Sequence, residues 1–342
     1  MSEQNSRRTD RMAILGAGSW GMAIASLLHQ QVDRLQLWEY SLEDYQRLVD
    51  TRGNPGRLTD FRLPESIGVT NNLAEAVTDA DVIVLAVPSQ YLRSVVQKIP
   101  RELSHAPVVV NLAKGIENGS LKRMSEILLD ETSLSPEQVG TLSGPSHAEE
   151  VVLDMPTTIV AASPSAELAQ RLQQLFSVGN LRVYMSDDIV GVELGGSLKN
   201  IIAIAAGIAD GLGLGDNTKG ALMTRGLAEI TRLGVAMGAR METFAGLSGV
   251  GDLVTTCFSR HSRNRFVGEQ IGKGRRLDEI LQSMTMVAEG IQTTRSGLEL
   301  ARVHGVEVPI TEQVHEVLFK GKSPAEAVGD LMERKLRAEV WQ

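Results

Sequence analysis

Short apolar runs alternate with amphipathic stretches through the first half of the chain. The runs predicted to be strands are residues 12–15, 35–38, 82–87, 108–113, 157–162 and 181–184. The stretches between them that are predicted to be helical lie near 22–28, 42–49, 90–98 and 120–130. Continuous apolar runs bounded by turn residues are typical of strands inside a parallel sheet. The alternation therefore predicts a doubly wound parallel sheet with helices on both faces.

The pattern changes near residue 189, where strand signals nearly vanish. The helical stretches beyond that point are roughly 189–210, 217–238, 264–272, 287–303, 311–319 and 323–335. The chain is therefore expected to form an α/β Rossmann-type domain over 11–188, followed by an all-α domain over 189–342. Residues 1–10 are polar and charged, lack the apolar core of a signal peptide, and are expected to form a flexible tail.

The first predicted strand ends in a glycine-rich turn that opens the first predicted helix. This turn reads Gly-Ala-Gly-Ser-Trp-Gly over 16–21, which is a G-x-G-x-x-G pattern. Gly16 permits a tight turn, Gly18 lets the backbone approach a pyrophosphate, and Gly21 lets helix and strand pack closely. The pattern alone is weak and also fits an ordinary turn. Its place between a strand and a helix favours dinucleotide binding.

An acidic residue, Glu39, lies at the end of the second predicted strand, about 20 residues after the glycine-rich turn. At this place a carboxylate can hydrogen-bond the adenosine ribose and repel a 2′-phosphate, whereas an arginine would do the reverse. Glu39 therefore favours NAD over NADP. A solvated residue at a strand end is the other interpretation.

The composition argues against several classes of protein. A formal net charge of −8 in 342 residues argues against general nucleic-acid binding, because phosphate backbones attract cationic surfaces. The longest uninterrupted apolar stretch, 201–209, is far shorter than the roughly 20 residues that span a bilayer, so no membrane insertion is expected. The single cysteine, Cys257, fits a reducing cytoplasm and is expected to be buried. The six histidines form no metal-ligand pattern, so no metal is expected.

Two lysines occupy places where a cation could take part in chemistry. Lys114 follows the predicted strand 108–113, at the sheet edge where ligands bind in such folds. Lys199 lies in an apolar helical stretch with Gly195 and Gly196, which indicate a close approach by another segment. Burial would lower the pKa of Lys199 toward the range of a general acid or base. The alternatives are an ordinary surface position for Lys114 and a Lys199 side chain that snorkels to solvent.

Further along, residues 249–252 are predicted to form a tight loop that carries the carboxylate of Asp252. Arg260, Arg263 and Arg265 then follow within six positions of an acidic chain. Arginine forks suit phosphate groups, and neighbouring serine and asparagine side chains add neutral donors. The segment therefore predicts either a phosphate pocket or a solvated face, and the net charge disfavours a nucleic-acid patch.

Taken in order, these segments resemble the bacterial NAD(P)-dependent glycerol-3-phosphate dehydrogenases. The resemblance extends from residue 12 to about 334. It rests on Gly-Ala-Gly-Ser-Trp-Gly at 16–21, Val-Pro-Ser at 87–89, Lys-Gly-Ile-Glu at 114–117, Ser-Gly-Pro-Ser at 143–146, Glu-Leu-Gly-Gly-Ser-Leu-Lys-Asn at 193–200, Gly-Asp at 251–252, Ser-Arg-Asn-Arg at 262–265, Glu-Gly at 289–290 and Pro-Ile at 309–310. Several motifs in one order are far more specific than the glycine-rich turn alone.

The resemblance implies a reaction and a set of roles. The reaction is reversible hydride transfer between NAD(P)H and dihydroxyacetone phosphate, which gives sn-glycerol 3-phosphate for phospholipid biosynthesis. Lys199 matches the proton acceptor for the 2-hydroxyl and would form the catalytic group with Lys114 and Asp252. The positions that match substrate contacts are Lys114, Gly144, Ser146, Lys199, Asp252, Ser262, Arg263 and Asn264. Together with Gly16, Gly18, Gly21 and Glu39, the positions expected to contact the cofactor are Ser19, Trp20, Tyr40, Lys114, Ala148, Arg263, Val287 and Glu289. Apolar helical faces in the second domain and the resemblance together imply a homodimer.

The chain departs from the family pattern at two places. His147 follows Gly-Pro-Ser where relatives often carry phenylalanine, beside the expected cofactor contact Ala148. Glu39 and Tyr40 stand where many members carry a basic residue, which strengthens the expectation of NAD. The alternatives are a related two-domain reductase of the 6-phosphogluconate or ketopantoate type and a non-catalytic NAD-sensing protein. The last of these would not need Lys199.

Overall fold

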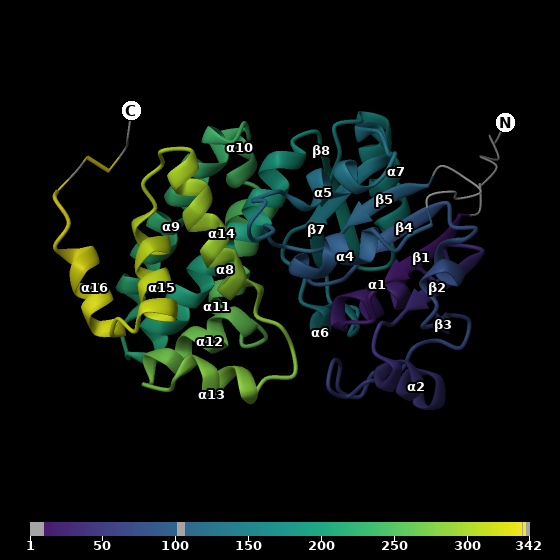
Figure 1. Cartoon of the computed structure of the whole chain (residues 1–342), viewed down its shortest axis with the longest axis horizontal. Coiled ribbons are helices and arrows are strands. Elements are labelled where there is room, and N and C mark those ends of the chain that lie inside the picture. The colour runs from purple at the N-terminus through teal and green to yellow at the C-terminus, as the bar shows by residue number, and fades with distance from the viewer. Residues whose placement is uncertain (1–9, 101–106, 337, 340–342) are drawn as a thin grey trace.

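The computed structural model describes residues 10–100, 107–336 and 338–339, and it places a sheet domain and a helical domain side by side (Figure 1). The expected tail, 1–10, lies outside the described residues except for Asp10. The last strand ends at Ser186 and the first long helix of the second domain begins at Ile189. The expected boundary at residue 188 falls between these two elements.

Eight strands form one sheet in the order β3-β2-β1-β4-β5-β6-β7-β8. Their bounds are β1 Arg11–Leu15, β2 Arg34–Trp38, β3 Gly68–Thr70, β4 Val82–Leu85, β5 Val108–Asn111, β6 Val139–Ser143, β7 Thr157–Ala162 and β8 Leu181–Ser186. The strand β1 lies in the interior of the sheet, where Ile14 is in register with Leu37 of β2 and Val84 of β4. All neighbouring pairs are parallel except β6 and β7.

The predicted doubly wound sheet is confirmed, but its parallel arrangement fails at β6–β7, which pair antiparallel. A parallel return needs a crossover, usually a helix about as long as the sheet is tall. The helix between these strands, α6 (Ala148–Val151), has only four residues and rises about 6 Å. The chain therefore re-enters the sheet from the end at which it left. This turn at the carboxyl end of β6 keeps residues 144–151 beside the site described below.

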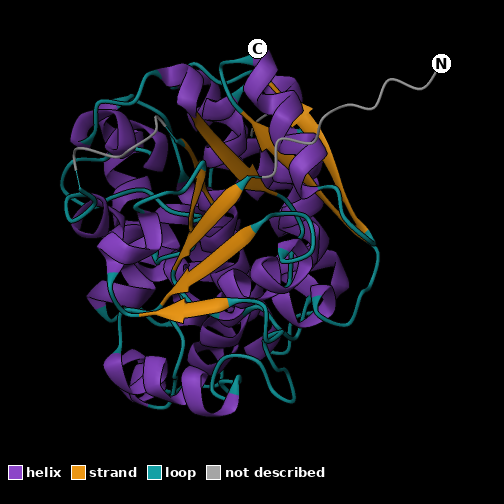
Figure 2. Ribbon diagram, turned by 90° about the vertical axis from the view of Figure 1, so that its right-hand side faces the viewer, coloured by secondary structure: helices purple, strands orange, loops and turns teal. Residues whose placement is uncertain are grey.

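Apolar residues cover both faces of the sheet, as the continuous apolar runs predicted. Along β1, Met12 and Ile14 belong to one buried cluster and Ala13 and Leu15 to another, because successive side chains point to opposite faces. The helices of this domain are α1 Ser19–Leu28, α2 Leu42–Thr51, α3 Leu73–Val77, α4 Leu92–Val96, α5 Met124–Glu131, α6 and α7 Ala166–Phe176, with short 3-10 turns η1 Ser89–Tyr91 and η2 Pro136–Gln138. Figure 2 shows helices on either side of the strands. The predicted ranges did not include the strands β3 and β6 or the helices α3, α6 and α7.

The second domain is helical throughout its described residues. Its elements are α8 Ile189–Gly211, α9 Asp216–Ala236, α10 Met241–Phe244, η3 Leu247–Gly251, α11 Asp252–Phe258, α12 Arg263–Gly272, α13 Leu277–Gln282, α14 Glu289–Val303, α15 Pro309–Lys320 and α16 Pro324–Met332. All six predicted helical stretches are confirmed. The axis of the domain is α8, which is long and apolar enough to cross a membrane, but 89% of its most apolar window is buried inside this structure. In this structure α8 is thus a core helix.

Candidate active site

The glycine-rich turn after β1 leaves backbone open at the amino end of α1. Gly16 has a φ of +115°, and a side chain there would lie 2.7 Å from the carbonyl oxygen of Ala86. At Gly21 a Cβ atom would lie 2.0 Å from the carbonyl oxygen of Gly16, so helix and turn touch directly. Gly18 has nothing within 4 Å of the place its Cβ would take. The turn thus offers free space beside backbone N–H groups at a helix N-terminus, which suits a pyrophosphate.

Of the other residues in this region, Ser19 and Glu39 are buried and Tyr40 is exposed. The Ser19 hydroxyl donates a hydrogen bond to the carbonyl of Arg57 at 2.7 Å. The carboxylate of Glu39 accepts one from the backbone of Ser41 at 2.8 Å, and burial raises its pKa. The interpretation of Glu39 as a solvated residue is therefore wrong, because only 8% of it is exposed. Tyr40 is 72% exposed beside it, and its ring meets the edge of Trp38.

Two lysines from different domains share one buried carboxylate. Asp252, at the start of α11, pairs through one oxygen with Lys114 Nζ at 2.9 Å and through the other with Lys199 Nζ at 2.9 Å. Lys114 follows β5 and also donates to the carbonyl of Gly144 at 2.7 Å and to Ser146 Oγ at 3.2 Å. Lys199 lies on α8 and is only 5% exposed. Both alternatives, a surface Lys114 and a snorkelling Lys199, are therefore wrong.

The shared carboxylate sets the charge state of the pair. Burial lowers the pKa of Lys199 to about 8, with the Lys114 cation acting in the same direction and Asp252 against it. Burial disfavours the charged form of Asp252 too, but Lys114 and Lys199 outweigh it and hold the pKa of Asp252 below its usual value. Lys199 can therefore exchange a proton near neutral pH, whereas Asp252 stays ionised.

Glycines in α8 allow the two domains to meet at this point. A side chain at Gly196 would lie 2.3 Å from Ser143 Oγ, at the end of β6, and 3.6 Å from Lys114 Cγ. One at Gly195 would lie 2.6 Å from the carbonyl oxygen of Ser248 in η3. The close approach that these glycines predicted is confirmed, and it brings Lys199 to the carboxyl end of the sheet.

The prediction of a tight loop over 249–252 is wrong. Residues 247–251 form a π-helical turn, and Asp252 begins α11 directly. The helix matters because it places Thr256, four residues on, above Asp252. Lys199 donates to the Thr256 hydroxyl, which lies 3.3 Å from Asp252 Oδ1. Thr256 was not predicted as a site residue, because a neutral side chain four residues after Asp252 indicates a site only once this segment is known to be helical.

The three arginines after α11 do not share one site. Arg265 pairs with Asp210 at 2.7 Å, and Arg260 is exposed. Arg263, at the start of α12, is partly covered, and its guanidinium makes no hydrogen bond to any described residue. Burial lowers its pKa, against the pull of Glu149 and Glu289. Of the three, Arg263 is the one that is partly covered and makes no hydrogen bond to a described residue.

Its neighbours are already engaged. The Ser262 hydroxyl caps α12 by accepting from Arg265 N at 3.2 Å. The Asn264 amide donates to Asn200 Oδ1 at 2.9 Å and accepts from Gly290 N at 2.9 Å. Asn264 thus ties α12 to both α8 and α14, and its partner on α8, Asn200, is another residue absent from the predicted set. These contacts fix the frame around Arg263.

The remaining expected cofactor positions come from both domains. Glu289 Oε1 accepts from the backbone of Ser89 at 2.9 Å, while its Oε2 is buried with no hydrogen-bond partner. Ala148 is buried on α6, which packs on α1, and Val287 is 45% exposed. Trp20 packs, partly buried, against the sheet-domain core. The burial expected for Cys257 is confirmed, and burial raises the pKa of its thiol to about 12.

Among the described residues, no group of three or more histidine, cysteine, aspartate or glutamate side chains could hold a metal ion. The groups available for chemistry and binding are a buried amine, its carboxylate partner and an open glycine-rich turn. A mostly parallel dinucleotide-binding sheet, joined to a helical domain that supplies such a lysine, defines a two-domain nicotinamide-dependent oxidoreductase.

Comparison with known proteins gives the family. The model described as NAD-dependent glycerol-3-phosphate dehydrogenase N-terminus matches residues 11–169, and the corresponding C-terminus model matches 188–329. The chain belongs to the NAD-dependent glycerol-3-phosphate dehydrogenase family. The resemblance inferred from the motifs is thereby confirmed.

Individual relatives agree. The chain is 51% identical to glycerol-3-phosphate dehydrogenase [NAD(P)+] 2 of Salinibacter ruber, over 96% of each chain. The crystal structure of glycerol-3-phosphate dehydrogenase from Coxiella burnetii superposes with a TM-score of 0.91 at 36% identity and covers 95% of this chain and 99% of that one. A ketopantoate reductase from Ralstonia eutropha, at 15% identity and a TM-score of 0.60 over 93% of this chain and 99% of that one, shares the fold alone.

Proposed function

We propose that this chain catalyses reversible hydride transfer between NAD(P)H and dihydroxyacetone phosphate to give sn-glycerol 3-phosphate, with Lys199 as the general acid and base. The observation that carries the proposal is the buried Lys199, held by Asp252 at 2.9 Å and facing Lys114 of the other domain. The names of relatives that are about half identical over nearly the full length support the substrate and the cofactor.

The residues present fit a nicotinamide dinucleotide. The open backbone at Gly18 and the amino end of α1 would receive the pyrophosphate, and the buried Glu39 would bond the adenosine ribose. When bound, the nicotinamide would supply the hydride acceptor for C2 of the alcohol and the hydride donor for the ketone. Glu289, with a buried oxygen that lacks a partner, has an acceptor to offer a bound ligand near Ser89.

Lys199 moves the proton that accompanies the hydride. In oxidation the neutral amine takes the proton of the C2 hydroxyl as C2 loses hydride. In reduction the ammonium polarises the ketone oxygen and then protonates it. A pKa of about 8 makes both forms accessible near neutral pH. Asp252 holds the two amines in place, and the Lys114 cation favours the neutral form of Lys199.

Arg263 would bind the substrate phosphate. Its guanidinium is partly buried and makes no hydrogen bond to a described residue, so its fork can pair with phosphate oxygens. We include Ser262 and Asn264 in the same subsite as supporting groups. Gly144 and Ser146, which accept hydrogen bonds from Lys114, would contact the substrate at the lysine end. Holding the phosphate would position C2 against the nicotinamide, and this positioning is itself a catalytic contribution.

The direct test is steady-state oxidation of NADH and of NADPH with dihydroxyacetone phosphate as the acceptor. We expect turnover with both, faster with NADH because Glu39 repels the additional phosphate. Activity with neither cofactor would refute the proposal. We assign the enzyme to phospholipid biosynthesis, because sn-glycerol 3-phosphate supplies the backbone of phospholipids. We assign it to the cytoplasm, because a reducing compartment suits the buried free thiol of Cys257.

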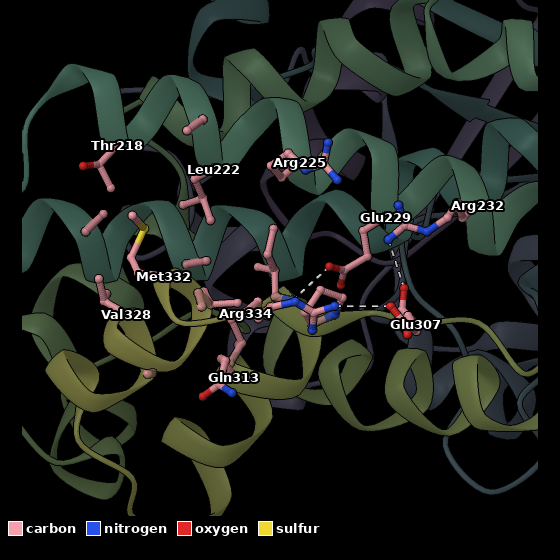
Figure 3. A pocket seen from close by; sticks show the side chains of 18 of the residues that line it. Thr218, Leu222, Arg225, Glu229, Arg232, Glu307, Gln313, Val328, Met332 and Arg334 are labelled. Carbon is pink, nitrogen blue, oxygen red and sulfur yellow. Dashed lines mark hydrogen bonds and ion pairs between the residues drawn. The ribbon is translucent and has the colours of Figure 1, made fainter. Parts of the chain in front are cut away.

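We further propose that the enzyme is a homodimer that associates through the groove between α9, α15 and α16 (Figure 3). The groove has a volume of about 1140 Å³ and is mainly apolar. Met332 is 79% exposed and Leu336 fully so, although both are large and apolar. Arg334 and Glu307, which line the groove, already pair with each other at 3.2 Å, so two copies would associate mainly through apolar contacts.

Light scattering on the purified enzyme tests this interface. We expect a dimer that Ala221→Arg, on α9 in the groove, converts to a monomer. Ala166→Arg, at an exposed position on α7 in the sheet domain, should leave the mass unchanged. A monomeric wild-type enzyme, or a dimer that withstands Ala221→Arg, would contradict the proposed interface.

A further inference from the structure

A histidine, His147, lies next to the lysine pair of the site. His147 lies at the N-cap of α6, directly after the segment that turns back from β6. Its ring centroid lies 5.9 Å from that of His261, on the segment between α11 and α12. The ring therefore stands between the two domains, beside Ser146, which accepts a hydrogen bond from Lys114.

One nitrogen of this ring has no partner. Nε2 of His147 is buried and makes no hydrogen bond. Buried polar atoms in native structures are nearly always hydrogen-bonded, because a buried polar atom without a hydrogen bond costs free energy. A phenylalanine at this position would avoid that cost. An unpartnered nitrogen next to a substrate site therefore points to a group that a ligand brings.

The ring lies at the lysine end of the site. Burial lowers the pKa of His147 to about 4, and the charges of Lys199 and Lys114 add to this effect. Asp252 opposes it, and His261 acts weakly in the same direction as the lysines. At pH 7 the imidazole is thus neutral and has one N–H donor and one acceptor lone pair. Such a ring suits a hydroxyl group, which can accept from it or donate to it.

We propose that His147 Nε2 hydrogen-bonds the C1 hydroxyl of dihydroxyacetone phosphate and makes that hydroxyl a determinant of substrate specificity. This inference rests on the proposed function. The C2 carbonyl faces Lys199, and the phosphate arm extends toward Arg263. The other arm of the substrate is a single hydroxymethyl group bonded to C2, so its oxygen stays near the lysine end, where His147 lies.

The proposal predicts discrimination against a substrate that lacks this hydroxyl. A site built to bond a substrate hydroxyl rejects the analogue without it, because the protein's own polar group is then left buried and unpaired. Hydroxyacetone phosphate is the suitable probe, since it keeps the ketone and the phosphate and replaces the C1 hydroxymethyl group by a methyl group.

The test is a double comparison of two enzymes with two substrates. The holoenzyme and its His147→Phe variant are assayed for kcat/KM with dihydroxyacetone phosphate and with hydroxyacetone phosphate. We expect His147→Phe to lower kcat/KM about threefold to tenfold with dihydroxyacetone phosphate, the size of one neutral hydrogen bond. With hydroxyacetone phosphate the same variant should show no loss. The preference for the hydroxylated substrate should therefore shrink by the same factor.

Two controls separate a structural effect from a specific one. His147→Gln keeps a donor and an acceptor and should retain most of the preference that His147→Phe loses. The NADH dissociation constant and the melting temperature should stay close to wild type in both variants. Equal losses with the two substrates, or an unchanged preference in His147→Phe, would overturn this inference while wild-type turnover left the proposed function standing. Absence of wild-type turnover would instead refute both.

Discussion

The two domains offer their ligands different kinds of contact. The sheet domain presents backbone atoms. The turn at Gly16–Gly21 is contiguous in sequence, and its free space beside Gly18 leaves room for a ligand. The helical domain presents side chains, with the charge of Lys199 set by burial and by Asp252. A backbone site needs residues that are small, whereas a side-chain site needs residues that are buried and paired. The first requirement is local and the second is not.

This difference separates binding from chemistry. The turn is expected to hold the cofactor whatever the reaction, while the lysine–aspartate–lysine bridge and Arg263 are expected to select the substrate and carry the proton. Changes in one region should therefore leave the function of the other measurable. The following experiments test that separation, from the largest expected effect to the smallest.

Replacing Lys199 by alanine should abolish chemistry and leave cofactor binding intact. Loss of a positioned acid–base group costs about 10²–10⁴-fold in rate, so kcat for dihydroxyacetone phosphate should fall by that factor. Stopped-flow and steady-state rates measure the loss, and fluorescence titration measures NADH affinity. Lys273→Ala, at an exposed lysine, is the matched control. Undiminished turnover would exclude Lys199 as the acid and base.

Replacing Arg263 by alanine should chiefly raise the KM of the phosphorylated substrate. A charge-assisted hydrogen bond contributes about 1.5–3 kcal/mol, so KM should rise by about 10–100-fold. Dihydroxyacetone, which lacks the phosphate, supplies the comparison and should lose far less. The exposed Arg260 provides the control substitution. The same loss with both substrates would show that Arg263 does not bind the phosphate.

A change in pH should alter proton transfer at Lys199 and leave cofactor binding at the glycine-rich turn unaltered. Oxidation needs neutral Lys199, whose pKa is about 8, so its rate should rise about tenfold per pH unit up to pH 8 and level off above it. Reduction needs the ammonium and should fall above pH 8. NADH affinity, measured over the same range, should stay flat. Opposite slopes, or a cofactor affinity that follows the same curve, would contradict this assignment.

The turn itself can be probed at two glycines with different surroundings. Gly18→Ala has room in the free protein, so the melting temperature should hold while the NADH dissociation constant rises about tenfold, because the new methyl group enters the space for the pyrophosphate. Gly21→Ala forces a clash with Gly16 and should lower the melting temperature as well. Gly329→Ala, with open space around it, is the control. Unchanged NADH binding in Gly18→Ala would contradict the proposed role of the turn.

The smallest expected effect concerns the choice between cofactors. Glu39→Gln removes a charge that would repel a 2′-phosphate, so the ratio of kcat/KM for NADH over NADPH should fall by about threefold to tenfold. The exposed Glu43→Gln, a few residues on, should leave the ratio alone. A ratio that does not move in Glu39→Gln would place the origin of the preference elsewhere.

The sequence predicted the strands and long helices well, because each carries its own periodicity. It failed where neighbours decide the outcome. No feature of residues 157–162 predicts that β7 runs antiparallel to β6. The direction of β7 follows from the shortness of α6, which precedes it. The segment before Asp252 looked like a loop because of its glycines, yet it forms a π-helical turn. A Cβ atom at Gly249 would lie 2.0 Å from the carbonyl oxygen of Phe244, so the glycine there serves close packing and not a loop.

The candidate site was predicted in the same uneven way. Lys199, Lys114 and Asp252 came from motifs, but only the folded chain shows that Asp252 pairs with Lys114, 138 positions before it, as well as with Lys199. Arg260 and Arg265 looked equal to Arg263 in the sequence, and Asp210 in α8 separates them by pairing with Arg265. Thr256 and Asn200 were missed because neutral side chains carry no signal until their partners are known.

The sequence by itself determined the fold class, the order of the two domains, the glycine-rich turn and the family, since these rest on periodicity and on contiguous motifs. The tertiary structure decided the burial of Lys199, the pairing of Asp252 with both lysines, the isolation of Arg263 and the unpartnered nitrogen of His147. The physical reason is that burial and charge pairing depend on distances between segments remote in sequence. A shifted pKa or a buried atom without a hydrogen bond arises only where those segments meet in the folded chain.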